Sequence, residues 1–206
     1  MIAFGPVPSR RLGRSLGVNN IPPKFCTYAC VYCQLGRTPN MQVKRERLHG
    51  SEEVVKSVKT KVTQAEEKGE RIDYVAFVPD GEPTLDIDLG REIDLIRELG
   101  IKIAVISNAS LIWNEDVRDE LSRADWVSVK VDAVREDTWH RINRPHGSLS
   151  LEEILEGIRD FSRSFGGELA TETMLVEGLN DNVEELNGIA EFIAEVEPAV
   201  SYISIP

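Results

Sequence analysis

The chain has 206 residues, of which 41% are hydrophobic and 29% charged, and its formal net charge is −11 at pH 7. This length and composition predict one folded domain over residues 1–206, and no apolar run approaches the roughly 20 residues of a membrane-spanning helix. The acidic balance argues against broad non-specific binding to phosphate backbones. Reduced cysteines and an N-terminus without the charged and apolar regions of a signal peptide predict a cytoplasmic protein.

Short apolar strands alternate with amphipathic helices along most of the chain, after a start that looks irregular. The predicted strands are 15–19, 73–78, 101–106, 126–131, 168–176 and 200–205. The predicted helices are 52–68, 88–99, 114–123, one that opens at a capping box on Ser150, and one from a capping box on Asp181 to about Val196. Ser51 is the expected N-cap of the first helix. This order predicts βαβ units in a parallel sheet, and it does not separate a flat sheet from a partly closed barrel.

All three cysteines lie in one short stretch after the first predicted strand. Cys26, Cys30 and Cys33 have the spacing C-x-x-x-C-x-x-C. The odd number argues against a disulfide framework, and thiolates this close together predict a soft metal centre. Zinc would need a fourth ligand, for which His49 is the nearest candidate, whereas a cluster of four irons can use three thiolates and leave one iron open. We favour the cluster, because His49 has no second ligand beside it.

The cysteine spacing, with Tyr32 as the aromatic residue before the last cysteine, resembles the signature of the radical SAM superfamily. The resemblance implies that Cys26, Cys30 and Cys33 hold a [4Fe–4S] cluster whose fourth iron binds S-adenosylmethionine, with Tyr32 beside the adenine. It also implies a partial (βα)6 barrel of parallel strands. In the family, further chain follows the sixth strand, so we expect residues 1–206 to be a single core domain that lacks a C-terminal extension.

In parallel α/β folds, ligands collect at the carboxyl ends of the strands. The stretch 79–85, after the second predicted strand, resembles the Gly-Gly-Glu motif of the family, with Asp80 in place of the first glycine. The resemblance implies that Gly81, Glu82 and Pro83 contact the cofactor, and that backbone carbonyls and the Glu82 carboxylate accept its methionine ammonium group. The side chain of Asp80 would either crowd this site or add a carboxylate to it.

Polar residues also follow the third predicted strand and alternate along the fourth. The resemblance puts Ser107 and Asn108 near the ribose or carboxylate of the cofactor, although a polar turn that caps the next helix is an equal alternative. Lys130 and Asp132 alternate with valines, which predicts that one face of the strand looks into a polar cavity, where Lys130 could neutralise a carboxylate of cofactor or substrate. The segment 139–146 is expected to be a loop.

The stretch from Gly5 to Gly17 resembles the branch that includes the wybutosine-synthesising tRNA enzymes and small prokaryotic proteins of unassigned function. The hypothesis is an enzyme that cleaves S-adenosylmethionine reductively to a 5′-deoxyadenosyl radical, which abstracts hydrogen from an unidentified substrate. A reductant protein of the flavodoxin or ferredoxin type is the implied partner, and RNA modification is a candidate reaction.

A local basic patch could bind RNA, or a phosphate- or carboxylate-bearing substrate: Arg10, Arg11, Arg14, Lys24, Lys44, Arg45 and Arg47. The alternatives are an activase that installs a radical on a partner protein, and a non-catalytic zinc knuckle that recognises RNA.

Overall fold

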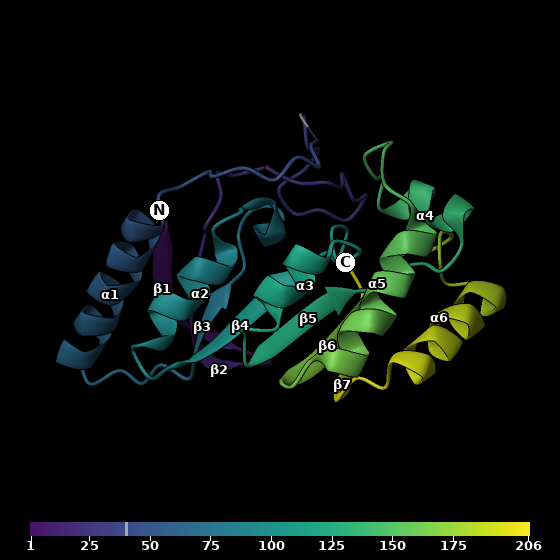
Figure 1. Cartoon of the computed structure of the whole chain (residues 1–206). Helices are drawn as coiled ribbons and strands as arrows, with labels where there is room; N and C mark the ends of the chain where they lie inside the picture. Colours follow the sequence, from purple (N-terminus) through teal and green to yellow (C-terminus); the bar gives the residue numbers. More distant parts are fainter. Residues whose placement is uncertain (40) are drawn as a thin grey trace.

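The fold, given by a computed structural model that describes residues 1–39 and 41–206, is built on one seven-stranded sheet (Figure 1). The strands lie in the order of the chain, and β2 to β7 are parallel, while β1 pairs with β2 in the antiparallel sense. Their bounds are β1 Ala3–Ser9, β2 Gly13–Val18, β3 Tyr74–Phe77, β4 Lys102–Ser107, β5 Trp126–Lys130, β6 Glu168–Met174 and β7 Val200–Ser204.

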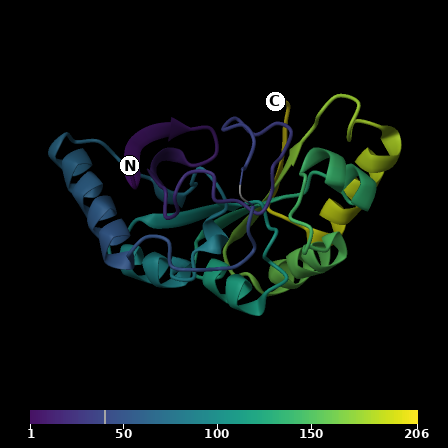
Figure 2. The same ribbon diagram turned by 90° about the horizontal axis from the view of Figure 1, so that it is seen from above.

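The helices lie on the outer side of the curved sheet and the cysteine loop lies on its inner side, while the β1–β2 hairpin forms one edge of the sheet (Figure 2). The helices are α1 Ser51–Glu67, η1 Pro83–Leu85, α2 Leu89–Arg97, α3 Glu115–Leu121, α4 Glu136–Ile142, α5 Leu151–Ser164 and α6 Val183–Val196. The parallel α/β class is confirmed, and the curvature is consistent with the predicted partial barrel. None of the helices in the described residues is both long and apolar enough to cross a membrane.

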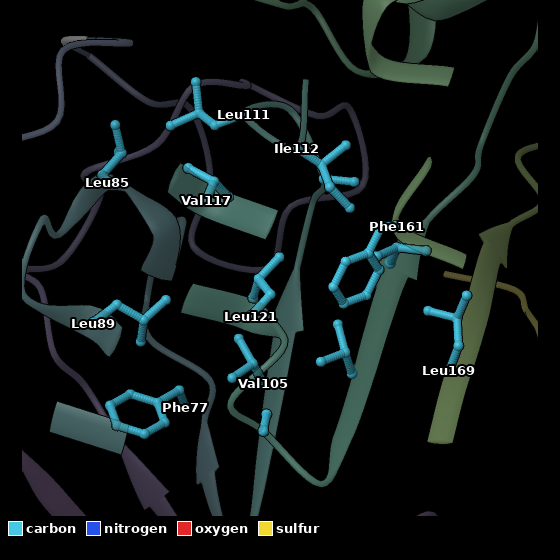
Figure 3. Packing of buried hydrophobic residues seen from close by; sticks show 14 of the residues in the cluster. Phe77, Leu85, Leu89, Val105, Leu111, Ile112, Val117, Leu121, Phe161 and Leu169 are labelled. Atoms are coloured by element: carbon cyan, nitrogen blue, oxygen red, sulfur yellow. The ribbon is translucent and has the colours of Figure 1, made fainter. Parts of the chain in front are cut away.

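The two faces of the sheet carry different side chains because alternate residues of a strand point to opposite sides. On the outer face, Phe77 and Val105 pack against helix residues such as Leu121 and Phe161 in the main core (Figure 3). On the inner face the middle of the sheet carries alanines, Ala76, Ala104 and Ala170. These small side chains leave space on the inner face, which other segments of the chain can occupy.

The turn of the N-terminal hairpin fills the space above these alanines on the inner face. Leu12, from the turn between β1 and β2, is 3% exposed and packs with the inner-face alanines and Trp126. Gly17 in β2 has no side chain because a Cβ there would lie 2.1 Å from the ring of Phe4 on β1. The hairpin therefore forms the closed end of the half-barrel.

Two segments that looked irregular from the sequence are regular elements. The expectation for the first residues is wrong, because residues 3–9 form β1; Pro6 and Pro8 lack N–H donors, and an edge strand tolerates that loss. The loop expected over 139–146 is also wrong in part, because α4 runs to Ile142. That helix is too short to show a clear period, and its position depends on packing of Trp139 against Tyr28.

The predicted helix caps are partly confirmed. The side chain of Ser150 accepts a hydrogen bond from the backbone N–H of Glu153, as the capping box requires. Ser51 is instead the first residue of α1, and Gly50 takes the N-cap position. The cap of α6 is Asn182 rather than Asp181, one residue later than expected. Adjacent cap-forming residues compete, and the tertiary position of the helix selects between them.

Candidate active site

A cavity of about 480 Å³ opens on the inner face at the carboxyl ends of the parallel strands. Its walls come from the cysteine loop on one side and from the strand ends and the last residues of the chain on the other. The lining residues are Cys26, Cys30, Tyr32, Cys33, Gln34, Val78, Pro79, Gly81, Ile106, Ser107, Asn108, Lys130, Glu172, Met174, Ile205 and Pro206. Of the site residues expected from the sequence, all line this cavity except Glu82, Pro83 and Asp132, which lie behind its wall.

The cysteine loop has little secondary structure of its own, and other loops hold its backbone in place. The N–H of Glu82 donates to the carbonyl of Phe25 at 2.9 Å, which joins the loop to the end of β3. On the other side, the N–H of Ala29 donates to the carbonyl of Asn143 at 3.1 Å, and that of Val31 to the carbonyl of Ile142 at 2.9 Å. The loop is thus fixed between the β3 turn and the end of α4.

The turn after β3 has space for a side chain at residue 80 and none at residue 81. A Cβ on Gly81 would lie 1.9 Å from the carbonyl oxygen of Phe25, so only glycine allows the cysteine loop to approach this closely. Asp80 is tolerated in place of a glycine because it lines a second, smaller cavity of about 180 Å³ on the far side of the cysteines. It therefore neither fills the main cavity nor adds a carboxylate to it.

Glu82 is fully buried, and its carboxylate is occupied by hydrogen bonds within the chain. Its Oε1 accepts from the N–H and hydroxyl of Thr84 at 3.1 and 2.6 Å and from the hydroxyl of Ser107 at 2.7 Å, and Oε2 accepts from the N–H of Asn108 at 2.7 Å. Burial raises its pKa, while these donors act against the rise. The carboxylate joins the turn after β3 to the end of β4.

Asp132 has a similar joining role on the other side of the cavity. Its side chain is fully buried and pairs with Lys130 at 3.1 Å. It also accepts from the N–H of Met174 at 2.8 Å, from Nδ2 of Asn143 at 2.8 Å and from the hydroxyl of Tyr32. Burial raises the pKa of the Tyr32 phenol, and the adjacent Asp132 carboxylate raises it further. One carboxylate therefore connects the cysteine loop, β5, α4 and the end of β6.

The wall opposite the cysteines carries a charge pair that spans the hollow. Arg11, from the hairpin turn, donates two hydrogen bonds to Glu172 on β6, one of them at 3.0 Å, and lies 4.5 Å from the ring centre of Tyr202 on β7. Burial opposes ionisation of Glu172, but the hydrogen bond from Arg11 and the charge of Lys130 lower its pKa overall. Glu172 thus remains an anion on the cavity wall.

The structure does not gather the predicted basic patch into one free surface. Arg45 is held by Glu120 and two backbone carbonyls near α3, and Arg47 pairs with Asp88 at the start of α2. Arg11 pairs with Glu172, and Arg14 lies 3.8 Å from Glu70. Within the described part of the chain, the members without an ion pair are Arg10, Lys24 and Lys44.

The donor set fits an iron–sulfur cluster better than a zinc ion. His49 lines a separate cavity beside Met1 and α1, so it is not placed to complete a tetrahedron with the cysteines. In the described residues, no three His, Cys, Asp or Glu side chains lie close enough together to hold a single metal ion. A four-iron cluster does not require such convergence, because each thiolate binds a different iron. Burial raises the pKa of Cys26 to about 12, so metal binding would have to displace its proton.

Two residues of this site were missed from the sequence. Asn143 lies at the end of a helix that was expected to be a loop, and nothing in its local pattern marks it. Glu172 could have been found, because it alternates with Ala170 and Met174 in the same period-two pattern that singled out Lys130.

The comparisons with known proteins decide the family. The family model for the radical SAM superfamily matches residues 20–193. The chain belongs to the radical SAM superfamily. Enzymes of this superfamily use a [4Fe–4S] cluster and S-adenosylmethionine for radical chemistry, so this is an enzyme of that class, and the non-catalytic zinc knuckle is set aside.

Two curated relatives match almost the whole of this radical SAM chain, and a solved structure shares its fold. It is 50% identical over 205 residues to a UPF0026 protein of Methanocaldococcus jannaschii, of which it spans 63%, and 35% identical to a UPF0026 protein of Synechocystis, of which it spans 74%. Its fold is similar to that of TYW1 with a lysine–pyruvate adduct bound, with a TM-score of 0.70 and 19% identity over 92% of this chain and 65% of that one.

Proposed function

We propose that Cys26, Cys30 and Cys33 hold a [4Fe–4S] cluster in this chain and that the 480 Å³ cavity beside them receives S-adenosylmethionine. The observation that carries the proposal is that one cavity is lined both by the three thiols and by the ends of successive parallel strands. When bound, the cluster and cofactor supply reductive cleavage of the cofactor to methionine and a 5′-deoxyadenosyl radical, which takes hydrogen from a substrate.

Some residues of the site would touch the cofactor, and others hold these contact residues in position. Tyr32, Lys130, Pro79 and Gly81 line the cavity. We expect Tyr32 to contact the adenine, Lys130 the carboxylate, and the backbone of Pro79 and Gly81 the ammonium group. Glu82 and Asp132 are buried behind these residues, so we assign Glu82 and Asp132 the role of holding the contact residues in position.

We further propose that an external reductant, of the flavodoxin or ferredoxin type, delivers the electron, and that the substrate meets the cavity beside Lys130 and Glu172. An RNA substrate is less favoured than the sequence suggested, because four of the seven basic residues near the cysteines already form ion pairs with acidic side chains of this chain. An activase role finds no specific support among the described residues.

The test is anaerobic reconstitution with iron and sulfide. We expect about four irons per chain, a low-temperature spin signal on reduction, and slow cleavage of S-adenosylmethionine to 5′-deoxyadenosine under a strong reductant. Replacing any of Cys26, Cys30 or Cys33 with Ala should abolish the spin signal and the cleavage, whereas His49→Ala should leave both unchanged. Stoichiometric zinc with no iron in the reconstituted protein would overturn the proposal.

A further inference from the structure

Two side-chain amides donate hydrogen bonds to two of the three cysteine sulfurs. Nδ2 of Asn108 lies 3.5 Å from Sγ of Cys26, and Nδ2 of Asn143 lies 3.5 Å from Sγ of Cys30. Asn108 follows the end of β4, and Asn143 caps the end of α4, so the two donors reach the cysteine loop from different elements. The described residues place no side-chain amide against Sγ of Cys33.

The surroundings of Asn143 determine which way its amide points. Nδ2 lies 2.8 Å from Oδ2 of Asp132, and only the NH₂ group of the amide can donate to that carboxylate. The second hydrogen of this NH₂ group points between two acceptors, Sγ of Cys30 at 3.5 Å and the hydroxyl oxygen of Tyr32 at 3.4 Å. A buried carboxylate thus orients a donor onto a cysteine sulfur, as the outer-shell partners of metal ligands commonly do.

Asn108 is oriented in an equivalent way by backbone groups. Its Oδ1 accepts from the N–H of Ser110 at 2.9 Å, and its own N–H donates to Glu82 at 2.7 Å. Its Nδ2 also donates to the hydroxyl of Thr27 at 2.9 Å. Because the oxygen of the amide must face Ser110, the NH₂ group must face Cys26.

We propose that Asn143 and Asn108 are positioning residues that set the reduction potential of the cluster, an inference that rests on the proposed function of the cysteines. A hydrogen bond to a cluster sulfur stabilises the reduced state, which carries the greater negative charge on sulfur, and so raises the potential. The cluster held by this chain therefore has two sulfurs tuned by side-chain amides, one oriented by the Asp132 carboxylate and one by the N–H of Ser110.

The experiment compares Asn143→Ala and Asn108→Ala with Asn180→Ala as the matched control. Like Asn143, Asn180 is buried and bonds to Asp132, but its amide donates to the backbone carbonyl of Asp132 at 2.7 Å and to that of Met174 at 2.9 Å, with no bond to sulfur. The midpoint potential of each reconstituted protein is measured without S-adenosylmethionine, by titration of the spin signal. We expect Asn143→Ala and Asn108→Ala to shift to more negative potential and Asn180→Ala to keep the wild-type value.

Asn143→Leu keeps the approximate size of the side chain and removes the NH₂ donor without adding a charge, so it should shift the potential in the same direction even if the alanine variant folds poorly. Equal potentials in wild type, Asn143→Leu and Asn108→Ala at full iron content would overturn the inference alone. A shift in Asn180→Ala as large as that in Asn143→Ala would also overturn it, because loss of local structure would then explain the change. A wild-type protein that binds no iron would overturn the proposed function first.

Discussion

At the scale of single residues, the carboxylate of Glu82, which stands in a family motif, joins the turn after β3 to the end of β4. Its position in the motif suggested direct contact with the ammonium group of the cofactor. In the structure its carboxylate receives four hydrogen bonds from the chain, two of them from backbone N–H groups. A buried backbone N–H that loses its acceptor has no alternative partner, so this carboxylate stabilises the fold even in the iron-free protein.

We therefore expect Glu82→Gln to lower the free energy of unfolding of the iron-free protein by about 1–3 kcal/mol, because the new NH₂ group would face the N–H of Asn108. Urea denaturation measures the change. Asp80→Ala, two residues earlier and turned toward the smaller cavity, should cost less than about 0.5 kcal/mol. If Glu82→Gln is as stable as wild type but binds S-adenosylmethionine more weakly, the residue acts on the cofactor directly.

Glu92 is a buried acid that lies outside the candidate site. It is on α2, 0% exposed, and neither carboxylate oxygen has a hydrogen-bond partner in the described residues. Burial raises its pKa to about 9, with further contributions from Asp86 and Asp88. The folded protein keeps the proton that the unfolded chain loses near pH 4.5, so this group stabilises the fold less and less as the pH rises toward 9.

Glu92→Gln mimics the protonated acid and should remove that dependence. Each pH unit between the two pKa values corresponds to at most about 1.4 kcal/mol, so between pH 6 and pH 8 wild type should lose on the order of 2 kcal/mol more stability than the variant. Asp86, whose pKa burial raises to about 6, is present in both proteins and cancels from the comparison. Glu98→Gln, at an exposed position beside α2, is the control; parallel pH profiles for wild type and Glu92→Gln would contradict the prediction.

At the scale of elements, the β1–β2 hairpin closes one end of the half-barrel and also reaches across it. Leu12 fills the inner face, and Arg11 beside it pairs with Glu172 on β6, which is 161 residues later in the chain. Glu172 lines the cavity on the wall opposite the cysteines. The hairpin is therefore an indirect support for the site as well as an edge of the sheet.

Arg11→Met should destabilise the iron-free protein by about 1–2 kcal/mol, because it leaves the Glu172 carboxylate half-buried without its main partner. Arg10→Met is the matched control, since Arg10 is exposed and has no ion pair in the described chain; its effect should stay within about 0.5 kcal/mol. Thermal unfolding followed by circular dichroism measures both. Equal effects of the two substitutions would show that the Arg11–Glu172 pair adds nothing to stability.

At the scale of the whole molecule, the parallel topology explains why the motifs meet. Six parallel strands in chain order bring their carboxyl ends to one edge, so the residues after β3, β4 and β5 had to lie near the cysteines that follow β2. Gly81, Ser107, Asn108 and Lys130 could be placed at the cavity for this reason alone. The prediction that the basic residues form a patch had no such topological basis, and the structure pairs four of the seven with acidic side chains of the chain.

The sequence by itself determined the parallel α/β class, the place of the cysteine loop and the resemblance to the family, because these depend on local periodicity and on the spacing of a few residues. Only the tertiary structure decided the partners of the buried polar groups. That Asp132 orients Asn143 onto Cys30, or that Glu82 lies behind the cavity rather than in it, depends on side-chain packing between segments up to about a hundred residues apart. Such contacts leave no periodic trace in the sequence, because a single hydrogen bond constrains only the two residues that make it.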